Sequence, residues 1–114
     1  MIAVIFELEP CEGATDRYFE LAAELRPALE AMEGFISVER FESVTSKGRY
    51  LSLSFWRDEA AVRAWRCHGL HRGAQQEGRS SVLARYRLRV AHVVRDYGLL
   101  DRGEVPSDSL SALM

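Results

Sequence analysis

The chain has 114 residues, which is the length of a single domain and is enough to bury a hydrophobic core. Its composition, with 47% apolar and 28% charged residues, is that of a globular protein and excludes a disordered chain. A net charge of −2 disfavours a nucleic-acid-binding protein, and two cysteines are too few for the disulfide framework of a small secreted protein.

The sequence also predicts that no membrane and no nucleotide cofactor are involved. No apolar run approaches the ~20 residues that a transmembrane helix needs. The first residues lack the basic start of a signal peptide and continue directly into Glu7, so we expect a strand there and a cytoplasmic protein. Neither GxGxxG nor GxxxxGK followed by Ser or Thr is present, which removes the usual phosphate-binding loops.

The chain as far as Gly34 predicts a strand followed by a helix. Apolar residues alternate with others over residues 2–8, and Pro10 ends the strand. Thr15 or Asp16 is predicted to cap the helix, and Gly34 stands where such a helix stops. The helix has one apolar stripe at helical spacing, which consists of Tyr18, Leu21, Ala22, Leu25, Leu29 and Met32.

The middle of the chain predicts a β-hairpin. Residues 35–43 have the pattern of a second strand, residues 45–48 that of a tight turn, and residues 49–56 that of a third strand. In the third strand two sets of side chains are predicted to face opposite sides of the sheet. One set is Leu51, Leu53 and Phe55, and the other is Tyr50, Ser52, Ser54 and Trp56.

The second half of the chain predicts two short helices and a last strand. Asp58 is placed to cap a helix that begins near Glu59, and a shorter helix is expected over residues 70–77. Residues 81–97 fit a helix at some positions, but the strict alternation over residues 85–90 favours a strand. So long a strand would exceed the domain, and it must bend or extend onto a partner subunit.

The order strand–helix–strand–strand–helix–strand is typical of an α+β, ferredoxin-like fold with an antiparallel sheet. Its helices cover one face of the sheet only. The other face needs cover, and a second copy of the chain is the simplest source, so we predict a homodimer. Residues 1–98 are expected to form the domain, and residues 99–114, which contain Gly103, Pro106 and three serines, a loose C-terminal tail.

Several segments resemble the antibiotic biosynthesis monooxygenase family. Residues 34–41, Gly-Phe-Ile-Ser-Val-Glu-Arg-Phe, resemble the second-strand signature of that family. Residues 50–56 and the segment from Asp58 to Arg66 resemble its third strand and second helix. Residues 71–75 and 86–90 fit the same pattern, so the resemblance covers about residues 2–98.

The resemblance implies a dimeric α/β barrel in which two sheets pack face to face, with a pocket in each subunit between the sheet and its helices. It implies oxidation of polycyclic phenols to quinones by O2 with no cofactor, because the electron-rich substrate itself activates oxygen. Other members degrade haem. That activity is disfavoured because Gln75 occupies the position of the haem-ligand histidine, and Phe6-Glu7 stands where that branch has an asparagine.

We therefore predict a cofactor-independent monooxygenase of a small aromatic or quinol-type compound. The alternative is a non-catalytic dimeric module, related to stress or to the binding of a small apolar ligand. Haem binding or degradation is a third hypothesis, in which His71 approaches the iron.

The residues predicted to carry the chemistry lie near the second helix. Histidine titrates near neutral pH, so His71 is predicted to take a phenolic proton, the alternative being a surface or helix-capping histidine. Trp65 and Trp56 are predicted to form aromatic walls whose indole N–H groups bond a substrate carbonyl. For both tryptophans the alternative is a plain core position.

Residues of the second and third strands are predicted to contact the substrate. They are Phe35, Tyr50 and Glu39. Glu39 is predicted to share a face with Phe35 and Phe41 and to act as a base among aromatic rings. The alternative for Glu39 is an exposed ion pair with a neighbouring arginine.

Arg87 completes the predicted site from the last strand. It lies in a row with Arg85 and Arg89, which predicts the binding of an anionic substrate or oxyanion. The alternative is a solvated face that pairs with Glu39, Glu42 or a carboxylate of the partner.

A metal site is not expected. Cys67, His68 and His71 carry side chains that ligate metals, but Gly69 interrupts their helical spacing and no acidic ligand is near them in sequence. Cys11 and Cys67 form no C-x-x-C motif and are expected to be inert thiols.

Overall fold

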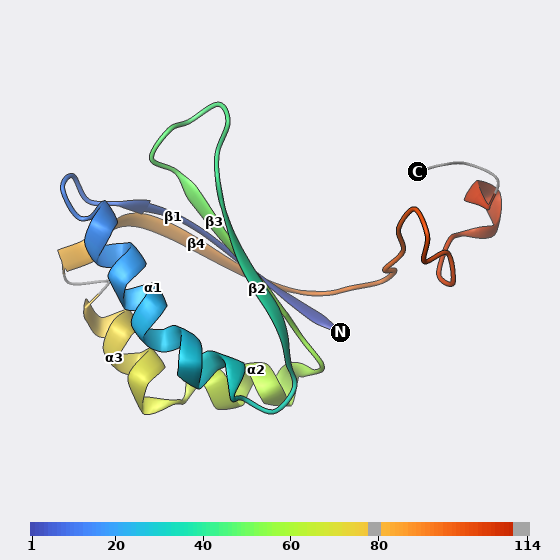
Figure 1. Cartoon of the computed structure of the whole chain (residues 1–114), viewed down its shortest axis with the longest axis horizontal. Helices are drawn as coiled ribbons and strands as arrows, with labels where there is room; N and C mark the ends of the chain where they lie inside the picture. Colours follow the sequence, from blue (N-terminus) through green and yellow to red (C-terminus); the bar gives the residue numbers. More distant parts are fainter. Residues whose placement is uncertain (78–80, 111–114) are drawn as a thin grey trace.

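The computed structural model describes residues 1–77 and 81–110 as a sheet with a layer of helices on one face (Figure 1). None of the described helices combines the length and the apolarity that crossing a bilayer requires. The strands are β1 (Ile2–Pro10), β2 (Phe35–Glu42), β3 (Tyr50–Trp56) and β4 (Leu83–His92), and the helices are α1 (Thr15–Glu30), α2 (Glu59–Arg66) and α3 (Gly69–Glu77).

The sheet is antiparallel, with the strand order β2–β3–β1–β4. β1 lies at its centre, where Ile2 is opposite both Trp56 of β3 and His92 of β4. The helices α1, α2 and α3 cover the same face (Figure 1). This arrangement confirms the predicted α+β, ferredoxin-like fold, and the two helices α2 and α3 occupy the place of the second helix.

β4 is shorter than the sequence predicted. The strand expected over residues 81–97 ends at His92, which pairs with Ile2, the first residue of β1. One further hydrogen bond follows, from the N–H of Val93 to the carbonyl oxygen of Met1 at 3.0 Å. The hydrogen-bond ladder between β1 and β4 stops here because β1 begins at Ile2. The prediction of a strand as far as Tyr97 is therefore wrong.

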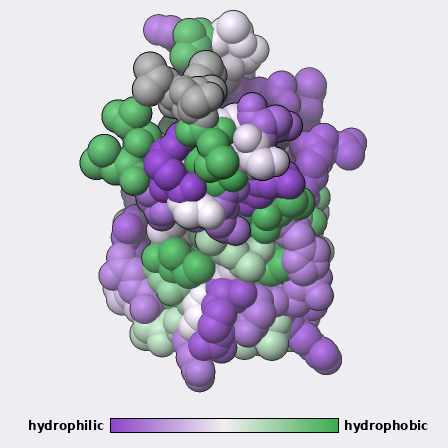
Figure 2. All heavy atoms as spheres, turned by 90° about the vertical axis from the view of Figure 1, so that its right-hand side faces the viewer, coloured by the Kyte–Doolittle hydropathy of each residue, from purple (hydrophilic) through white to green (hydrophobic). Residues whose placement is uncertain are grey.

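The segment after β4 leaves both layers of the fold (Figure 1). It contains a short 3-10 turn at Ser107–Ser109. The predicted tail, residues 99–114, belongs to this segment as far as residue 110, and residues 111–114 lie outside the described part. Figure 2 looks at this end of the molecule, where apolar surface alternates with polar surface. The exposed apolar residues of the segment are Val94, Tyr97, Leu99, Leu100 and Leu110.

The helix caps differ from the prediction at one of two sites. Asp58 caps α2 as predicted, because its Oδ1 accepts a hydrogen bond from the N–H of Ala61 at 2.9 Å. This bond, with a second from Arg57, holds the pKa of Asp58 below its ordinary value. The predicted cap of α1 by Thr15 or Asp16 is wrong: Ala14 occupies that position, with no side-chain cap bond.

The main core lies between the inner face of the sheet, which faces the helices, and the helices α1 and α2. Trp56 is 1% exposed, and its ring packs edge-on against Phe35 with centroids 5.4 Å apart. Its indole N–H donates to the Oγ of Ser54 at 3.0 Å, which satisfies the one polar group that it buries. The buried members of this core are Ile2, Leu29, Trp56, Ala61, Val62 and Trp65.

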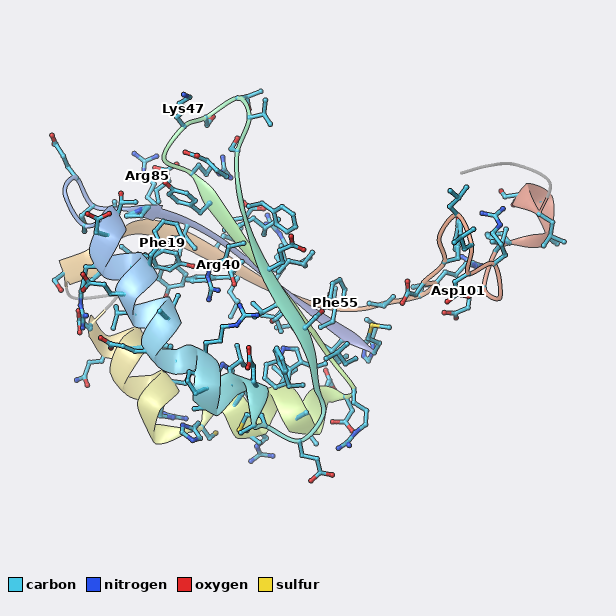
Figure 3. The ribbon with its side chains drawn as sticks, in the orientation of Figure 1. Phe19, Arg40, Lys47, Phe55, Arg85 and Asp101 are labelled. Carbon is cyan, nitrogen blue, oxygen red and sulfur yellow. The ribbon has the colours of Figure 1, made fainter. Side chains whose placement is uncertain are left out.

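The outer face of the sheet carries the side chains that alternate with these. Figure 3 shows Phe55 on this face, on the opposite side of the sheet from the helices. Among the described elements no helix packs here. The apolar part of the face consists of Ala3, Ile5, Phe41, Leu51, Leu53 and Phe55, and Phe41 is 44% exposed.

Candidate functional site

A cavity of about 220 Å³ lies between the inner face of the sheet and the helices. All four strands and all three helices contribute to its wall. The lining is mostly apolar, with side chains such as Val4, Phe6, Leu25, Leu29 and Leu88. Cavities of this kind, apolar with a few converging polar groups, are typical binding sites for small organic molecules.

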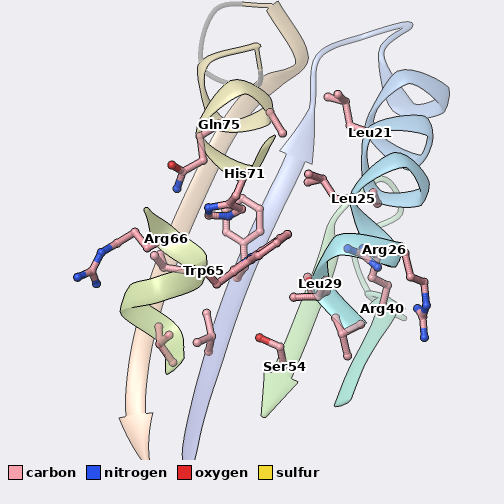
Figure 4. Close-up of a pocket in the computed structure, with 18 of the residues that line it drawn as sticks. Leu21, Leu25, Arg26, Leu29, Arg40, Ser54, Trp65, Arg66, His71 and Gln75 are labelled. Atoms are coloured by element: carbon pink, nitrogen blue, oxygen red, sulfur yellow. The ribbon is translucent and has the colours of Figure 1, made fainter. Parts of the chain in front are cut away.

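Trp65 and His71 form one side of the cavity (Figure 4). α2 ends at Arg66, and a turn follows in which the N–H of His68 donates to the carbonyl oxygen of Trp65 at 2.9 Å. α3 then begins at Gly69 and brings His71 back over Trp65, with ring centroids 4.9 Å apart. The break between the helices therefore places an imidazole against an indole, both facing the same cavity.

The imidazole of His71 is suited to accept a proton. Its Nδ1 is buried and has no hydrogen-bond partner among the described residues. Burial lowers the pKa of His71 below 6.5, and a hydrogen bond with the backbone of Arg66 only partly opposes this shift. At neutral pH the ring is therefore uncharged and presents an unused acceptor or donor nitrogen next to the cavity.

A second group of polar residues lies on the opposite side of the cavity. Figures 3 and 4 show Arg40 of β2 between the sheet and α1. Its Nε donates to the hydroxyl of Tyr18 at 3.2 Å. Ser52 is its cross-strand neighbour on β3, and Arg26 of α1 also lines the wall.

Three of the seven predicted site residues line this cavity: Trp65, His71 and Trp56. Trp56 is at the same time a member of the core, so its two predicted interpretations are not exclusive. Phe35 and Tyr50 lie on the inner face but outside the cavity wall. Phe35 packs on Trp56, and Tyr50 packs on Phe19 with ring centroids 5.2 Å apart.

Glu39 lies on the outer face, away from the cavity. The register of β2 shifts between Phe35 and Ser37, so that Phe35 is opposite Trp56 whereas Glu39 is opposite Leu53. The prediction that Glu39 shares a face with Phe35 is therefore wrong. An irregularity of one residue reverses the face of every residue that follows, and Arg40 enters the cavity instead.

Arg87 also lies on the outer face, opposite Glu7 of β1. The Oε2 of Glu7 accepts from Arg49 at 2.8 Å and its Oε1 from Arg89 at 3.2 Å, and the bond from Arg49 is the main reason that the pKa of Glu7 is lowered. Arg85 approaches Glu9 at 4.0 Å. Arg85 and Arg89 thus pair with carboxylates of β1, whereas the alternative prediction named Glu39, Glu42 or a carboxylate of the partner.

Cys67 lies beside the cavity region in an exposed position. Its Sγ is 3.6 Å from Nη2 of Arg72, and this contact lowers the pKa of the thiol, which the sequence predicted to be inert. Within residues 1–77 and 81–110, no three His, Cys, Asp or Glu side chains are close enough to hold a metal ion.

Sequence reasoning did not select Arg40, Tyr18 or Ser52 for the site. The alternation along β3 did predict that Ser52, Ser54 and Trp56 share a face. The adjacent apolar residues Phe35 and Ile36 interrupt the alternation of β2 at the irregularity, but such a pair does not by itself identify a register shift.

Comparison with known proteins agrees with the fold and assigns a family. A sequence profile of the family described as antibiotic biosynthesis monooxygenase matches residues 1–77. The protein named jasmonate monooxygenase ABM from Pyricularia oryzae is 46% identical over 93 residues, which are 82% of this chain and 43% of that protein. The uncharacterized protein YqjZ from Bacillus subtilis is 34% identical over 93 residues, 82% of this chain and 79% of that protein. The chain thus spans less than half of the Pyricularia relative.

Solved structures with the same fold are more distant in sequence. Rv0793 from Mycobacterium tuberculosis matches with a TM-score of 0.76 at 19% identity, over 83% of this chain and 96% of that one. SO0527 from Shewanella oneidensis matches with a TM-score of 0.74 at 17% identity, over 81% of this chain and 89% of that one. At these identities the likeness establishes the shared fold alone.

Proposed function

Because this chain belongs to the antibiotic biosynthesis monooxygenase family, we propose that it is a monooxygenase that oxidises a small aromatic or quinol-type compound with O2. The observation that carries the proposal is the buried Nδ1 of His71, which has no hydrogen-bond partner within residues 1–77 and 81–110 and belongs to a ring that packs on Trp65 beside an apolar cavity. We propose Trp65 and His71 as the catalytic residues and Trp56 as part of the wall that receives the substrate.

With an anthrone, or with the keto tautomer of a phenol, the reaction converts a ring methylene group of the substrate into a carbonyl group, with one oxygen atom of O2 kept as the carbonyl oxygen and the other released as water. His71 takes a proton from the bound substrate, which leaves an electron-rich anion. The anion transfers electrons to O2, a carbon–oxygen bond forms, and the resulting hydroperoxide loses water to give the carbonyl. The proton held by His71 returns in that water, so all four electrons come from the substrate and the proposal includes no cofactor.

The cavity supports this sequence by its shape and polarity. An apolar wall excludes water from a reactive anion, and the indole of Trp65 offers a flat surface to an aromatic ring. Glu39 and Arg87, which lie on the outer face, have no part in it. Phe35 acts indirectly, because its contact with Trp56 fixes one wall.

The test is O2 uptake by the purified protein with a panel of anthrones and hydroquinones, to which jasmonate is added because of the name of the Pyricularia relative. The buffer contains a chelator, and absorbance spectra verify that no flavin or haem accompanies the protein. We expect His71→Phe, which keeps an aromatic contact with Trp65, to lower turnover by about 100-fold or more.

His68→Phe is the matched control, because the ring of His68 also packs on Trp65, with centroids 5.4 Å apart, but does not line the cavity. It should leave turnover unchanged. If no compound supports O2 uptake, or if His71→Phe is as active as the wild type, the proposal is wrong. Ligand binding that His71→Phe leaves intact, without turnover, would instead support the non-catalytic binding module.

We also propose that two copies pair through the outer face of the sheet. Its apolar residues Ile5, Leu51, Leu53 and Phe55 are partly exposed, and no described helix packs over them. Light scattering should give twice the chain mass, and Leu53→Glu, which places a charge at the centre of that face, should give a monomer. A monomeric wild type would contradict the pairing.

A further inference from the structure

Arg40 is an unusual member of the cavity wall. It is half-buried, and it faces a lining that is mostly apolar. The register shift in β2 turns Val38 and Arg40 toward the helices and leaves Glu39 outside. The fold therefore turns the basic side chain of Arg40 into the cavity and the acidic side chain of Glu39 away from it, although the two residues are adjacent in sequence.

The guanidinium of Arg40 has no carboxylate partner among the described residues. Its Nε donates to the neutral hydroxyl of Tyr18, and within the same part of the chain its Nη1 and Nη2 have no protein acceptor. Arg17 and Arg49, by contrast, each bind a carboxylate at 2.6 to 2.8 Å. A half-buried cation without a counter-ion costs free energy that a bound anion would recover.

The charged side chains that line the described part of the cavity wall are all positive. Arg26, Arg40 and Arg66 line the cavity, and no Asp or Glu does so among the described residues. Arg26 is already paired with Glu30 at 2.6 Å and Arg66 is exposed, so among the described residues Arg40 is the half-buried cation of this wall that no carboxylate compensates. Ser52, directly across the ladder from Arg40, supplies a hydroxyl on the same face.

We propose that the compound bound in this cavity carries a carboxylate, which Nη1 and Nη2 of Arg40 hold in a two-point contact with Tyr18 and Ser52 beside it. A planar guanidinium matches the two oxygens of a carboxylate, and such charge-assisted pairs are stronger than neutral hydrogen bonds. This inference rests on the proposed function only in that it concerns the same cavity.

The position of Arg40 gives the carboxylate an orienting role. Figure 4 shows Arg40 on the α1 side of the cavity and His71 with Trp65 on the α2 and α3 side. A ligand anchored by its carboxylate at Arg40 extends its apolar body across the cavity toward His71. The substrate class is therefore an aromatic acid whose reacting group is separated from its carboxylate by the body of the molecule.

The experiment compares an acid with its neutral ester. Isothermal titration calorimetry at neutral pH measures the binding of naphthylacetate and of methyl naphthylacetate, which differ in charge but share the apolar body. We expect the wild type to bind the acid about 10- to 100-fold more tightly than the ester. Arg40→Gln should remove this preference while it leaves the affinity for the ester unchanged, and Arg40→Lys should restore part of it.

Arg26→Gln is the matched control, because it removes a cation of the same wall that already has a partner. It should keep most of the preference for the acid. Equal binding of acid and ester by the wild type, loss of both affinities in Arg40→Gln, or no binding of either probe would overturn the inference. Undiminished ester binding also verifies that Arg40→Gln is folded.

The same proteins separate this inference from the proposed function. If neutral anthrones support O2 uptake that depends on His71 while acid and ester bind equally, the monooxygenase proposal is supported and the carboxylate site is contradicted. If Arg40 confers preference for the acid but no compound supports O2 uptake, the carboxylate site is supported and the monooxygenase proposal is contradicted.

Discussion

The imidazole of His71 lies against the indole of Trp65, with their ring centroids 4.9 Å apart and their planes inclined by 38°. The two residues belong to different helices, and the contact joins α2 to α3 across the turn at Cys67 and His68. It also limits the rotation of the imidazole, so that the position of Nδ1 depends on the packing of both helices. A proton acceptor held in this way is preorganised for a substrate in the cavity.

The lowered pKa of His71 predicts how activity depends on pH. Because the neutral ring is the base, kcat/KM should be constant at high pH and should fall as the pH drops through the pKa of His71 in the folded protein. Burial places that midpoint below 6.5, the ordinary value for histidine. A pH profile of O2 uptake measures it, and a midpoint at or above 6.5 would contradict the role of a buried neutral histidine.

A pair of adjacent alanines tests whether the cavity is the binding site. Ala22 of α1 lines the cavity, whereas its neighbour Ala23 is exposed and does not. Ala22→Leu fills space that a ligand needs and should weaken binding by about 10-fold or more, since a packed site accommodates added methylene groups poorly. Ala23→Leu adds the same volume to the surface and should leave binding unchanged. Calorimetric titration of naphthylacetate distinguishes the two, and equal affinities would place the ligand elsewhere.

Gly34 predicts a loss of stability that can be separated into two causes. Its φ is +84°, and a Cβ added there would lie 2.7 Å from the Cβ of Ala61 in α2. Gly13 has a φ of +79° but open space around it, so Gly13→Ala should cost only the left-handed backbone conformation, about 1–2 kcal/mol. Gly34→Ala should cost about 1–3 kcal/mol more, because α2 must move away from the sheet. Urea denaturation measures both, and equal costs would show that α2 gives way freely.

The cap of α2 predicts a pH-dependent contribution to stability. Asp58→Ala removes the acceptor for the N–H of Ala61 and should lower the midpoint of thermal unfolding. The pKa of Asp58 is lower when folded than when unfolded, so its contribution is complete above the ordinary value of 3.8 and is lost as the pH falls through the folded value. Asp16→Ala, in the first turn of α1, removes an acid without a cap bond and should have a smaller effect. The difference between the wild type and Asp58→Ala should therefore vanish in acid, and a difference that persists there would assign the effect to packing.

The sequence allowed the fold to be predicted because each element carries its own local signal. These signals are short-range patterns. They are the alternation over β1 and β3, the helical stripe that includes Leu25 and Leu29, and the cap at Asp58. The end of β4 is not such a pattern, because it is set by the place where β1 begins. His71 and Trp65 could be selected for the cavity, whereas Arg40 could not, since its face depends on a backbone irregularity that the residue types alone do not identify.

The register shift in β2 makes the charge of the cavity depend on one backbone irregularity. Strand side chains alternate with a period of two, so a β2 in which Ile36, in place of Ser37, paired with Phe55 would exchange the faces of Glu39 and Arg40. The amino-acid composition would not change, yet a cation-lined chamber would acquire an acidic wall. The presence or absence of one backbone irregularity in this strand thus determines whether the scaffold presents a cation or an anion to the molecules in its cavity.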